Sequence, residues 1–165
     1  MLKLNRRTEY ALLSLRYLSQ PDRGLASARE VAEKYALPEN LLAKVLQILT
    51  QAGITRSLKG ASGGYSLARR LETITLWEVL VLFNESLVLV GCIDAAATCE
   101  CHLQTHCDIR PGMEALNRVL TAQFHGLYLN DFFDAHVTTT PVADTPRVAR
   151  RTPLSIQRRT SDYSP

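Results

Sequence analysis

The sequence has no long run of apolar residues. Its most apolar stretch, residues 76–90, contains Glu78, Asn84 and Glu85, which excludes a membrane-spanning helix there. The first ten residues also lack the apolar core of a signal peptide, because they are charged and lead into a helical pattern. We therefore expect a cytoplasmic protein that is not associated with a membrane.

Cysteine is absent from most of the chain. All four cysteines lie within residues 91–107, at Cys92, Cys99, Cys101 and Cys107. In the reducing cytoplasm, clustered cysteines favour metal binding or redox chemistry over structural disulfides. Several thiols on one short segment can converge on a metal, and the iron of iron–sulfur clusters takes thiolate ligands. The segment therefore predicts a metal centre, and we expect it to be an iron–sulfur cluster.

The spacing of the cysteines leaves other chemistries open. A zinc site could combine these thiols with His102 or His106, although the C-x-x-C pairs typical of zinc sites are absent. A metal-free switch, in which Cys99 or Cys101 is oxidised, is a third alternative. A cysteine enzyme is disfavoured, because no third group that would orient a Cys–His pair is evident. A small iron–sulfur electron-transfer protein is a rival of a different class, and it would not need the basic segment described next.

The overall charge of +3 conceals two parts of opposite sign. Residues 1–70 contain 12 Lys and Arg against 5 Asp and Glu, a net charge of +7, whereas residues 71–136 contain 2 against 9, a net charge of −7. Residues 137–165 contain 5 against 2 and few large apolar side chains, so we expect a disordered basic tail there. The first part has the sign needed to meet phosphate groups, and the acidic part would face away from them.

The basic part contains the pattern of a helix-turn-helix. Ser27 and Glu30 form a capping box that opens a short helix ending near Tyr35. Pro38 suits the first position of the next helix, which is expected over residues 38–52. The buried stripe of this second helix consists of Leu42, Val45, Leu46 and Leu49.

A basic hairpin is predicted directly after these two helices. Residues 54–58 and 65–68 read as strands joined by a glycine-rich tip, and this arrangement is typical of a winged helix. Another helix, over residues 5–19 and capped by Asn5, precedes the helix-turn-helix. We therefore expect a mainly α-helical fold with a small β-hairpin, in which residues 1–74 form a winged helix-turn-helix domain.

The winged helix supplies a set of candidate DNA contacts. We expect its second helix to enter the major groove, where Glu39 and Asn40 would read bases and Lys44 would meet phosphate. The start of the first helix, the capping box and the wing supply the remaining candidates, which are Arg6, Arg7, Ser27, Arg56, Lys59, Ser62, Gly63 and Gly64. The glycines would let the backbone of the wing approach a phosphate closely.

Residues 75–136 are expected to carry the metal centre and a dimer contact. A second capping box begins at Thr75 and opens a helix to about Asn84, and Pro111 marks the start of a long helix after the cysteines. The apolar residues of that helix are spaced by 3, 4, 4 and 3 positions, at Met113, Leu116, Leu120, Phe124 and Leu127. Such a seam is typical of packing against a partner helix, so we expect a homodimer that binds a roughly palindromic site in double-stranded DNA.

Together these motifs resemble the Rrf-type winged-helix transcriptional regulators, in the group of iron–sulfur cluster regulators and nitric-oxide-sensing repressors. The resemblance covers about residues 4–133 and is carried by residues 8–12 (TEYAL), by residues 60–69 (GASGGYSLAR), by the helix-turn-helix and by the cysteine segment. It implies a cluster, with 2Fe-2S favoured over 4Fe-4S, whose ligands are Cys92, Cys101 and Cys107. The fourth ligand that it implies is Glu9 of a partner chain or Cys99 of the same chain.

The chain departs from the family pattern at two positions. Cys99 is an additional thiol, and Arg110 stands where some relatives have a ligating histidine. The resemblance implies a DNA-binding repressor, not an enzyme, whose affinity for DNA is controlled by a cluster that senses redox state, iron or nitric oxide.

Overall fold

The chain folds into helices and one β-hairpin. The structure is a computed structural model that describes residues 4–60, 63–83, 88–93, 101, 103 and 106–137. Its elements, in which η denotes a 3-10 helix, are α1 (Arg6–Leu18), α2 (Ala28–Tyr35), α3 (Glu39–Gln51), β1 (Thr55–Leu58), β2 (Gly64–Leu67), η1 (Leu71–Thr73), α4 (Leu76–Leu82), η2 (Gly91–Ile93), α5 (Arg110–Gly126) and α6 (Leu129–Phe133). The mainly helical winged-helix prediction is confirmed. The tail expected over residues 137–165 lies outside the described residues, apart from Val137.

Helix α1 lies at the centre of the core. It is capped as expected, because the Asn5 side-chain oxygen accepts from the amide of Thr8 at 3.0 Å. The Asn5 side-chain amide also donates to the carbonyl of Phe83 at 3.0 Å, which ties the start of α1 to the end of α4. One buried cluster contains apolar side chains of α1 to α4 together with Leu129 of α6. The parts of the chain before and after residue 74 therefore share one core.

The helix-turn-helix is formed by α2 and α3. The predicted capping box is present, because the Ser27 hydroxyl accepts from the Glu30 amide at 3.2 Å and the Glu30 carboxylate accepts from the Ser27 amide at 2.6 Å. Helix α2 ends at Ala36, whose φ of 52° lies in the left-handed region and turns the chain toward α3. Pro38 is the N-cap of α3, so the helix begins one residue later than expected, because the backbone of Pro38 is extended.

The two strands of the wing pair antiparallel. Thr55 lies opposite Leu67, and Leu58 lies opposite Gly64. Both strands differ from the prediction by one residue: β1 begins after Ile54 and β2 begins at Gly64. Ile54 is completely buried, and it links the hairpin to α3 because its amide donates to the carbonyl of Leu49 and its carbonyl accepts from the amide of Ala68, both at 3.0 Å.

The wing is fixed to the chain segment that precedes α2. Ala26 and Tyr65 exchange backbone hydrogen bonds of 3.0 and 2.7 Å. A Cβ atom at Gly64 would lie 2.6 Å from the carbonyl oxygen of Ala26, so this approach requires glycine. The hairpin is therefore held in one orientation relative to the helix-turn-helix.

Helix α4 begins at the expected cap but is shorter than expected. The Thr75 hydroxyl accepts from the amide of Glu78 at 3.2 Å. The Glu78 carboxylate forms an ion pair of 2.5 Å with Arg69, and the reciprocal bond of a capping box is not formed. The helix ends at Leu82, whereas the prediction extended to about Asn84, which lies outside the described residues.

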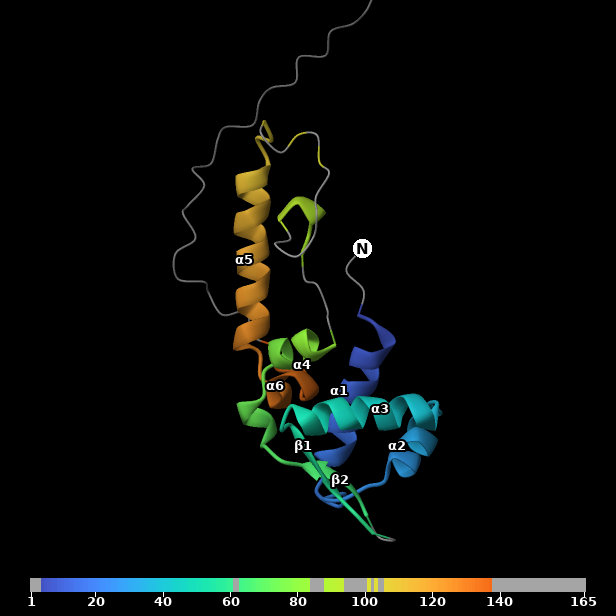
Figure 1. Ribbon diagram of the computed structural model, residues 1–165. Helices are drawn as coiled ribbons and strands as arrows, with labels where there is room; N and C mark the ends of the chain where they lie inside the picture. Colours follow the sequence, from blue (N-terminus) through green and yellow to red (C-terminus); the bar gives the residue numbers. More distant parts are fainter. Residues whose placement is uncertain are drawn as a thin grey trace, which may run out of the picture.

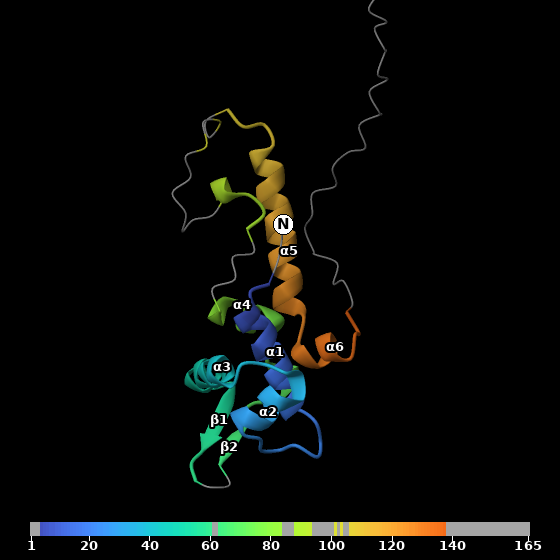
Figure 2. The ribbon, with the colours of Figure 1, turned by 90° about the vertical axis from the view of Figure 1, so that its right-hand side faces the viewer.

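Helix α5 extends away from the winged helix, as Figures 1 and 2 show. It begins at Arg110, one residue before the expected Pro111. At its other end, the amide of Leu76 donates to the carbonyl of Leu127 at 2.8 Å, and the amide of Leu129 donates to the carbonyl of Ile74 at 2.9 Å. These two bonds, which we call the foot of α5, attach the helix to the core.

Among the described residues, the apolar seam of α5 is covered only toward its foot, where Phe124 and Leu127 pack against the core. No residue of α5 is fully buried, and Leu116 is 48% exposed. The short helix α6, which the sequence did not predict, follows directly and packs beside η1. No helix in the described part of the chain is long and apolar enough to cross a membrane.

Candidate DNA-binding face and metal centre

Helix α3 presents a polar face to solvent near its N-terminus. Glu39, Asn40 and Lys44 are all exposed. The opposite side of the helix, which includes Leu42 and Leu46, is completely buried. The three predicted base-reading and phosphate-binding side chains are therefore accessible to a DNA groove.

The start of α1 lies beside this face. Arg6 and Arg7 are exposed, and together with Asn5, Leu41 and Phe83 they line a pocket of about 450 Å³. Leu41 belongs to the first turn of α3, so two guanidinium groups lie next to the predicted recognition helix. The structure thus places Arg6 and Arg7 next to the first turn of α3.

The wing contributes exposed basic side chains. Arg56 and Lys59 are exposed, and Arg56 donates to the hydroxyl of Ser66 at 2.9 Å across the two strands. Gly63 allows no side chain, because a Cβ atom there would collide with the backbone of the hairpin. The predicted contact Ser62 lies outside the described residues.

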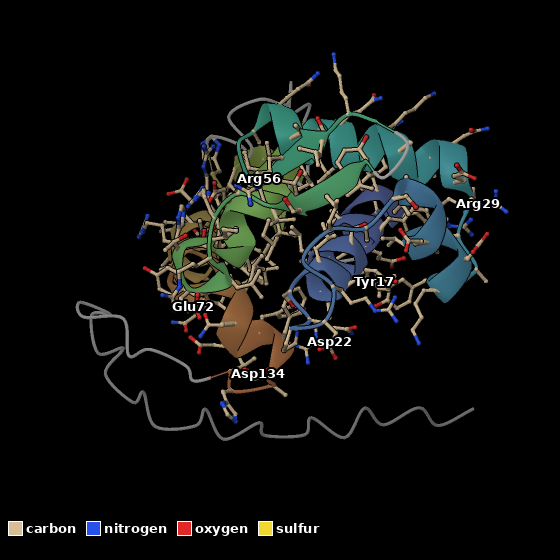
Figure 3. The ribbon with its side chains drawn as sticks, turned by 90° about the horizontal axis from the view of Figure 1, so that it is seen from below. Tyr17, Asp22, Arg29, Arg56, Glu72 and Asp134 are labelled. Carbon is tan, nitrogen blue, oxygen red and sulfur yellow. The ribbon has the colours of Figure 1, made fainter. Side chains whose placement is uncertain are left out.

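Charged side chains of both signs surround this end of the molecule. Figure 3, seen from the hairpin end, shows Arg56 and Arg29 toward α3, and Glu72 and Asp134 on the other side, near α6. Glu72 and Asp134 form ion pairs with Arg70 and Arg16.

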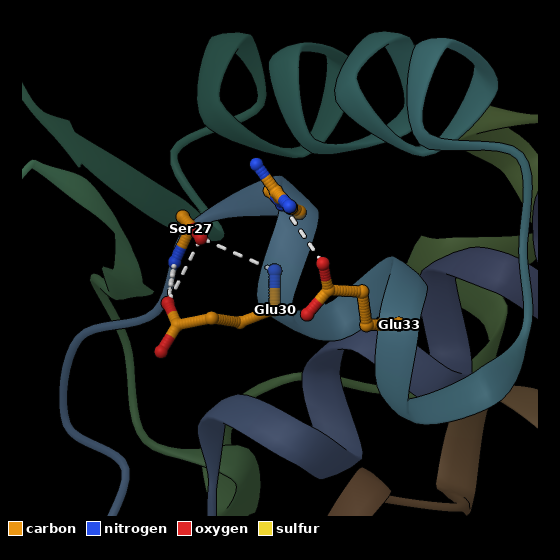
Figure 4. Close-up of polar contacts among 4 residues, drawn as sticks. Ser27, Glu30 and Glu33 are labelled. Atoms are coloured by element: carbon orange, nitrogen blue, oxygen red, sulfur yellow. Dashed lines mark hydrogen bonds and ion pairs between the residues drawn. The ribbon is translucent and has the colours of Figure 1, made fainter.

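Ser27, a predicted DNA contact, is engaged within its own helix cap. Its amide and its hydroxyl both donate to the carboxylate of Glu30, and its hydroxyl accepts from the Glu30 amide (Figure 4).

Arg29, in the first turn of α2, forms an ion pair of 2.8 Å with Glu33. The hydrogen bond to Glu33, then the charges of Glu33 and Glu39, raise the pKa of Arg29 above its usual value. Arg29 is an exposed cation that the sequence reasoning missed, although its place in the first turn of α2 was a signal.

The cysteine segment precedes α5 in the chain. The turn η2, which contains Cys92, lies beside α5 in both views (Figures 1 and 2). Cys92, Cys101 and Cys107 are free, half-buried thiols. Cys99 and His102 lie outside the described residues.

The described side chains do not form a closed metal site within one chain. In the described ranges, no three His, Cys, Asp or Glu side chains lie close enough together to hold a metal ion. Glu9 is exposed on α1, within the winged-helix part. The chemistry of the donor set still fits a thiolate-bound metal, because three free thiols lie on one segment.

Polar residues of α5 that the sequence reasoning did not single out contact this segment. The side-chain oxygen of Asn117 accepts from the amide of Leu89 at 3.1 Å. The side chain of Arg110 donates to Glu114 at 3.0 Å, and its backbone amide donates to the carbonyl of Cys107 at 3.3 Å. The signal available in the sequence was the helical spacing of Arg110, Glu114 and Asn117.

Comparison with known proteins assigns this arrangement to a family. The family profile of Rrf2, described as an iron-dependent transcriptional regulator, matches residues 4–135. A putative HTH-type transcriptional regulator of Aquifex aeolicus is 30% identical over 125 residues, which cover 76% of this chain and 87% of that protein. The HTH-type transcriptional regulator NsrR of Shouchella clausii is 34% identical over 110 residues, which cover 66% of this chain and 73% of that protein.

Solved structures share the fold. CymR, the global cysteine regulator of B. subtilis, has a TM-score of 0.63 at 20% identity, covering 82% of this chain and 98% of that one. IscR of T. potens has a TM-score of 0.56 at 20% identity, covering 87% of this chain and 94% of that one. The family match spans both the winged helix and α5. This chain therefore belongs to the Rrf2 family of transcriptional regulators, which are not enzymes.

Proposed function

We propose that this protein is a homodimeric repressor that binds a roughly palindromic operator with an affinity controlled by an iron–sulfur cluster, 2Fe-2S in preference to 4Fe-4S. Cys92, Cys101 and Cys107 would hold the cluster, with Glu9 of a second chain or Cys99 as the fourth ligand. When bound, such a group supplies an iron centre that responds to redox state, iron supply or small reactive ligands.

One observation carries the control part of the proposal: α5 joins the cysteine segment to the winged helix. Cys107 precedes the first turn of α5, and its carbonyl accepts from the amide of Arg110 at 3.3 Å. At the far end of α5, the foot joins Leu127 and Leu129 to the chain on either side of Thr75. A rearrangement of the thiols would therefore move a helix that is bonded to the DNA-binding core, which gives the two sites a physical connection.

The uncovered seam of α5 supports the homodimer. The seam residues are only partly buried in one chain, and Leu116 is 48% exposed. Apolar residues at helical spacing gain stability when they pack against a second helix. A twofold dimer would present two α3 helices, and such pairs recognise sites with twofold symmetry.

Related proteins support two versions of the control mechanism. NsrR and IscR are the relatives that motivate the cluster. CymR, which has been solved also in an oxidised form from Staphylococcus aureus, motivates a metal-free thiol switch instead. The three described cysteines are free thiols and form no metal-binding group with other described side chains, so the thiol switch is the second candidate. A segment that is braced by zinc is the third candidate. An electron-transfer protein would leave the exposed basic wing without a role.

The visible absorption spectrum, with iron and sulfide content, of protein purified without oxygen tests the proposal. Bands between about 320 and 460 nm with matching iron and sulfide would support the cluster. A colourless protein that contains zinc, or that takes up no iron and sulfide on reconstitution, would overturn it.

DNA binding completes the test. We expect cluster-loaded and cluster-free protein to differ in affinity for one duplex, selected from a random pool, at one fixed salt concentration. Equal affinities would leave a DNA-binding regulator without cluster control. The disulfide-oxidised and reduced apo forms, compared on the same duplex, would reveal a thiol switch.

A further inference from the structure

The wing is attached to both helices of the helix-turn-helix. Its second strand is bonded to the segment before α2, through the backbone bonds between Ala26 and Tyr65. Its first strand follows α3, and a pair of side chains reinforces the connection there. Thr55, the first residue of β1, is only 2% exposed, and its hydroxyl lies 2.9 Å from that of Thr50 in the last turn of α3. The strand that carries the basic side chains of the wing is thus linked to the predicted recognition helix.

The two hydroxyls form a chain that ends on the backbone of α3. The Thr50 hydroxyl donates to the carbonyl of Leu46 at 2.8 Å, whereas the Thr55 hydroxyl lies 3.5 Å from the same oxygen, which is long for a hydrogen bond. Each hydroxyl has one proton to donate, so Thr50 donates to Leu46 and Thr55 donates to Thr50. We call this arrangement the threonine chain. Removing the Thr55 hydroxyl therefore breaks the link to β1 and leaves Thr50 paired.

The position of Lys59 depends on the direction in which β1 leaves α3. Lys59 follows the last residue of β1 and lies four residues after Thr55, which is roughly 13 Å at the rise of an extended strand. The strands project beyond the helices in Figures 1 and 2. A small change of direction at Thr55 therefore becomes a larger displacement of the cation that is expected to meet a phosphate.

We propose that Thr50 and Thr55 are positioning residues for DNA binding, because the threonine chain fixes the orientation of the wing relative to α3. The base-reading side chains of α3 and the cations of the wing then meet one duplex as a rigid unit. A hairpin attached less firmly at its first strand would have to be ordered on binding, and that cost would offset part of the phosphate contact. This inference rests on the DNA binding of the proposed function and not on its cluster.

The test compares the loss of affinity caused by Lys59→Ala in several backgrounds, by fluorescence anisotropy on the selected duplex. In the wild type we expect a loss of roughly eightfold at about 0.1 M salt, since one phosphate contact contributes a salt slope of about 0.9. Thr55→Val removes the hydroxyl and keeps the shape of the side chain. In that background the loss should fall to about threefold or less, because the two sites are coupled. Thr55→Ser keeps the hydroxyl and should retain the full loss.

Ser14→Ala is the matched control for the background. The Ser14 hydroxyl is also completely buried, but it donates to the carbonyl of Tyr10 at 2.7 Å within α1. The full loss on Lys59→Ala should persist in this background. A loss that shrinks as much in Ser14→Ala as in Thr55→Val would overturn the inference, because the effect would then follow from the removal of any buried hydroxyl.

A second readout needs no DNA. The amide of Ala68 donates to the carbonyl of Ile54, next to Thr55, at 3.0 Å. Hydrogen exchange of this amide should accelerate in Thr55→Val, and exchange of the Tyr65 amide, which is held by Ala26, should change less. Unaltered exchange of the Ala68 amide would overturn the role of the threonine chain at the base of the wing.

The outcomes separate this inference from the proposed function. A Lys59→Ala variant that binds as the wild type does overturns the wing contact and this inference with it. A loss on Lys59→Ala that is equally large in the wild type and in Thr55→Val overturns the inference alone, because the wing would then contact DNA without needing the threonine chain.

Discussion

Trp77 of α4 stacks on His125 of α5, with ring centroids 4.5 Å apart and planes inclined by 35°. Trp77 is the single tryptophan of the chain, so intrinsic tryptophan fluorescence reports on the junction between these two helices. The junction lies next to the foot, where α5 is attached to the core.

Replacing His125 by Ala should expose Trp77 to water. We expect a red shift of the emission maximum and a loss of less than about 1 kcal/mol in the free energy of unfolding, because aromatic pairs contribute modestly and His125 is exposed. Emission spectra and denaturant titrations would measure both effects. His136→Ala, on another exposed histidine, is the control, and an identical spectrum for both variants would contradict the stack.

The capping box of α2 should make stability depend on pH. The amide of Ser27, then its hydroxyl, lower the pKa of Glu30 below its usual value. The stabilisation is therefore complete above the usual pKa of glutamate, about 4.3, and is lost as the pH falls through the lowered value. Thermal unfolding should show Glu30→Gln less stable than wild type at pH 7, with the difference shrinking in acid. Glu33→Gln, which loses only an exposed ion pair, should show little difference at any pH.

The wing should not tolerate a side chain at Gly64. A Cβ atom there would lie 2.6 Å from the carbonyl oxygen of Ala26, so Gly64→Ala must displace the backbone. We expect a loss of about 1–3 kcal/mol in the free energy of unfolding, as for overpacking in general. Gly24→Ala has no neighbour within 4 Å and should stay within about 0.5 kcal/mol of wild type. Equal stability of the two variants would show that the hairpin is not held against Ala26.

We expect some residues around α3 to contribute affinity for any DNA duplex and others to contribute preference for a DNA sequence. Lys59→Ala should weaken binding to all duplexes about equally and reduce the slope of log affinity against log salt by about one unit, because one phosphate contact is lost. Asn40→Ala should relax sequence preference. Fluorescence anisotropy at several salt concentrations would measure both. Arg118→Ala removes the same charge from α5, and a slope change as large as that of Lys59→Ala would argue against the wing contact.

The seam of α5 should control the oligomeric state. Leu116→Lys places a charge on the 48% exposed seam position and should shift the protein from dimer to monomer in analytical ultracentrifugation. Val137→Lys, at a position that is 57% exposed beyond α6, should leave the dimer intact. A Leu116→Lys variant that sediments as the wild type does would place the dimer contact elsewhere.

Local chemistry explains why most of the fold could be predicted. Asn5, Ser27 and Thr75 each accept from an amide three residues later, so the starts of three helices are encoded in side chains next to them. Boundaries were missed where a tertiary contact decides them. Ile54 was predicted as the first residue of a strand, but its amide donates to the carbonyl of Leu49 in α3, and β1 begins at Thr55.

The site was less predictable because its parts are far apart in the sequence. The cysteines can be recognised in the sequence by their residue type. Whether their thiols lie close together depends on the path of the backbone in three dimensions, and the spacing of the cysteines in the sequence does not determine that path. The contact of Asn117 likewise becomes visible only when Leu89 lies across from it.

The foot of α5 anchors one end of a long arm. A helix of this length spans roughly 25 Å, so a displacement of about 2 Å at the far end corresponds to a rotation of about 5° at the foot. Such a displacement would therefore turn the chain on either side of Thr75, to which the foot is bonded. The cysteine segment lies at the other end of α5, and the two bonds of the foot join backbone atoms only. Substitutions of side chains in the cysteine segment would therefore leave these two bonds unchanged.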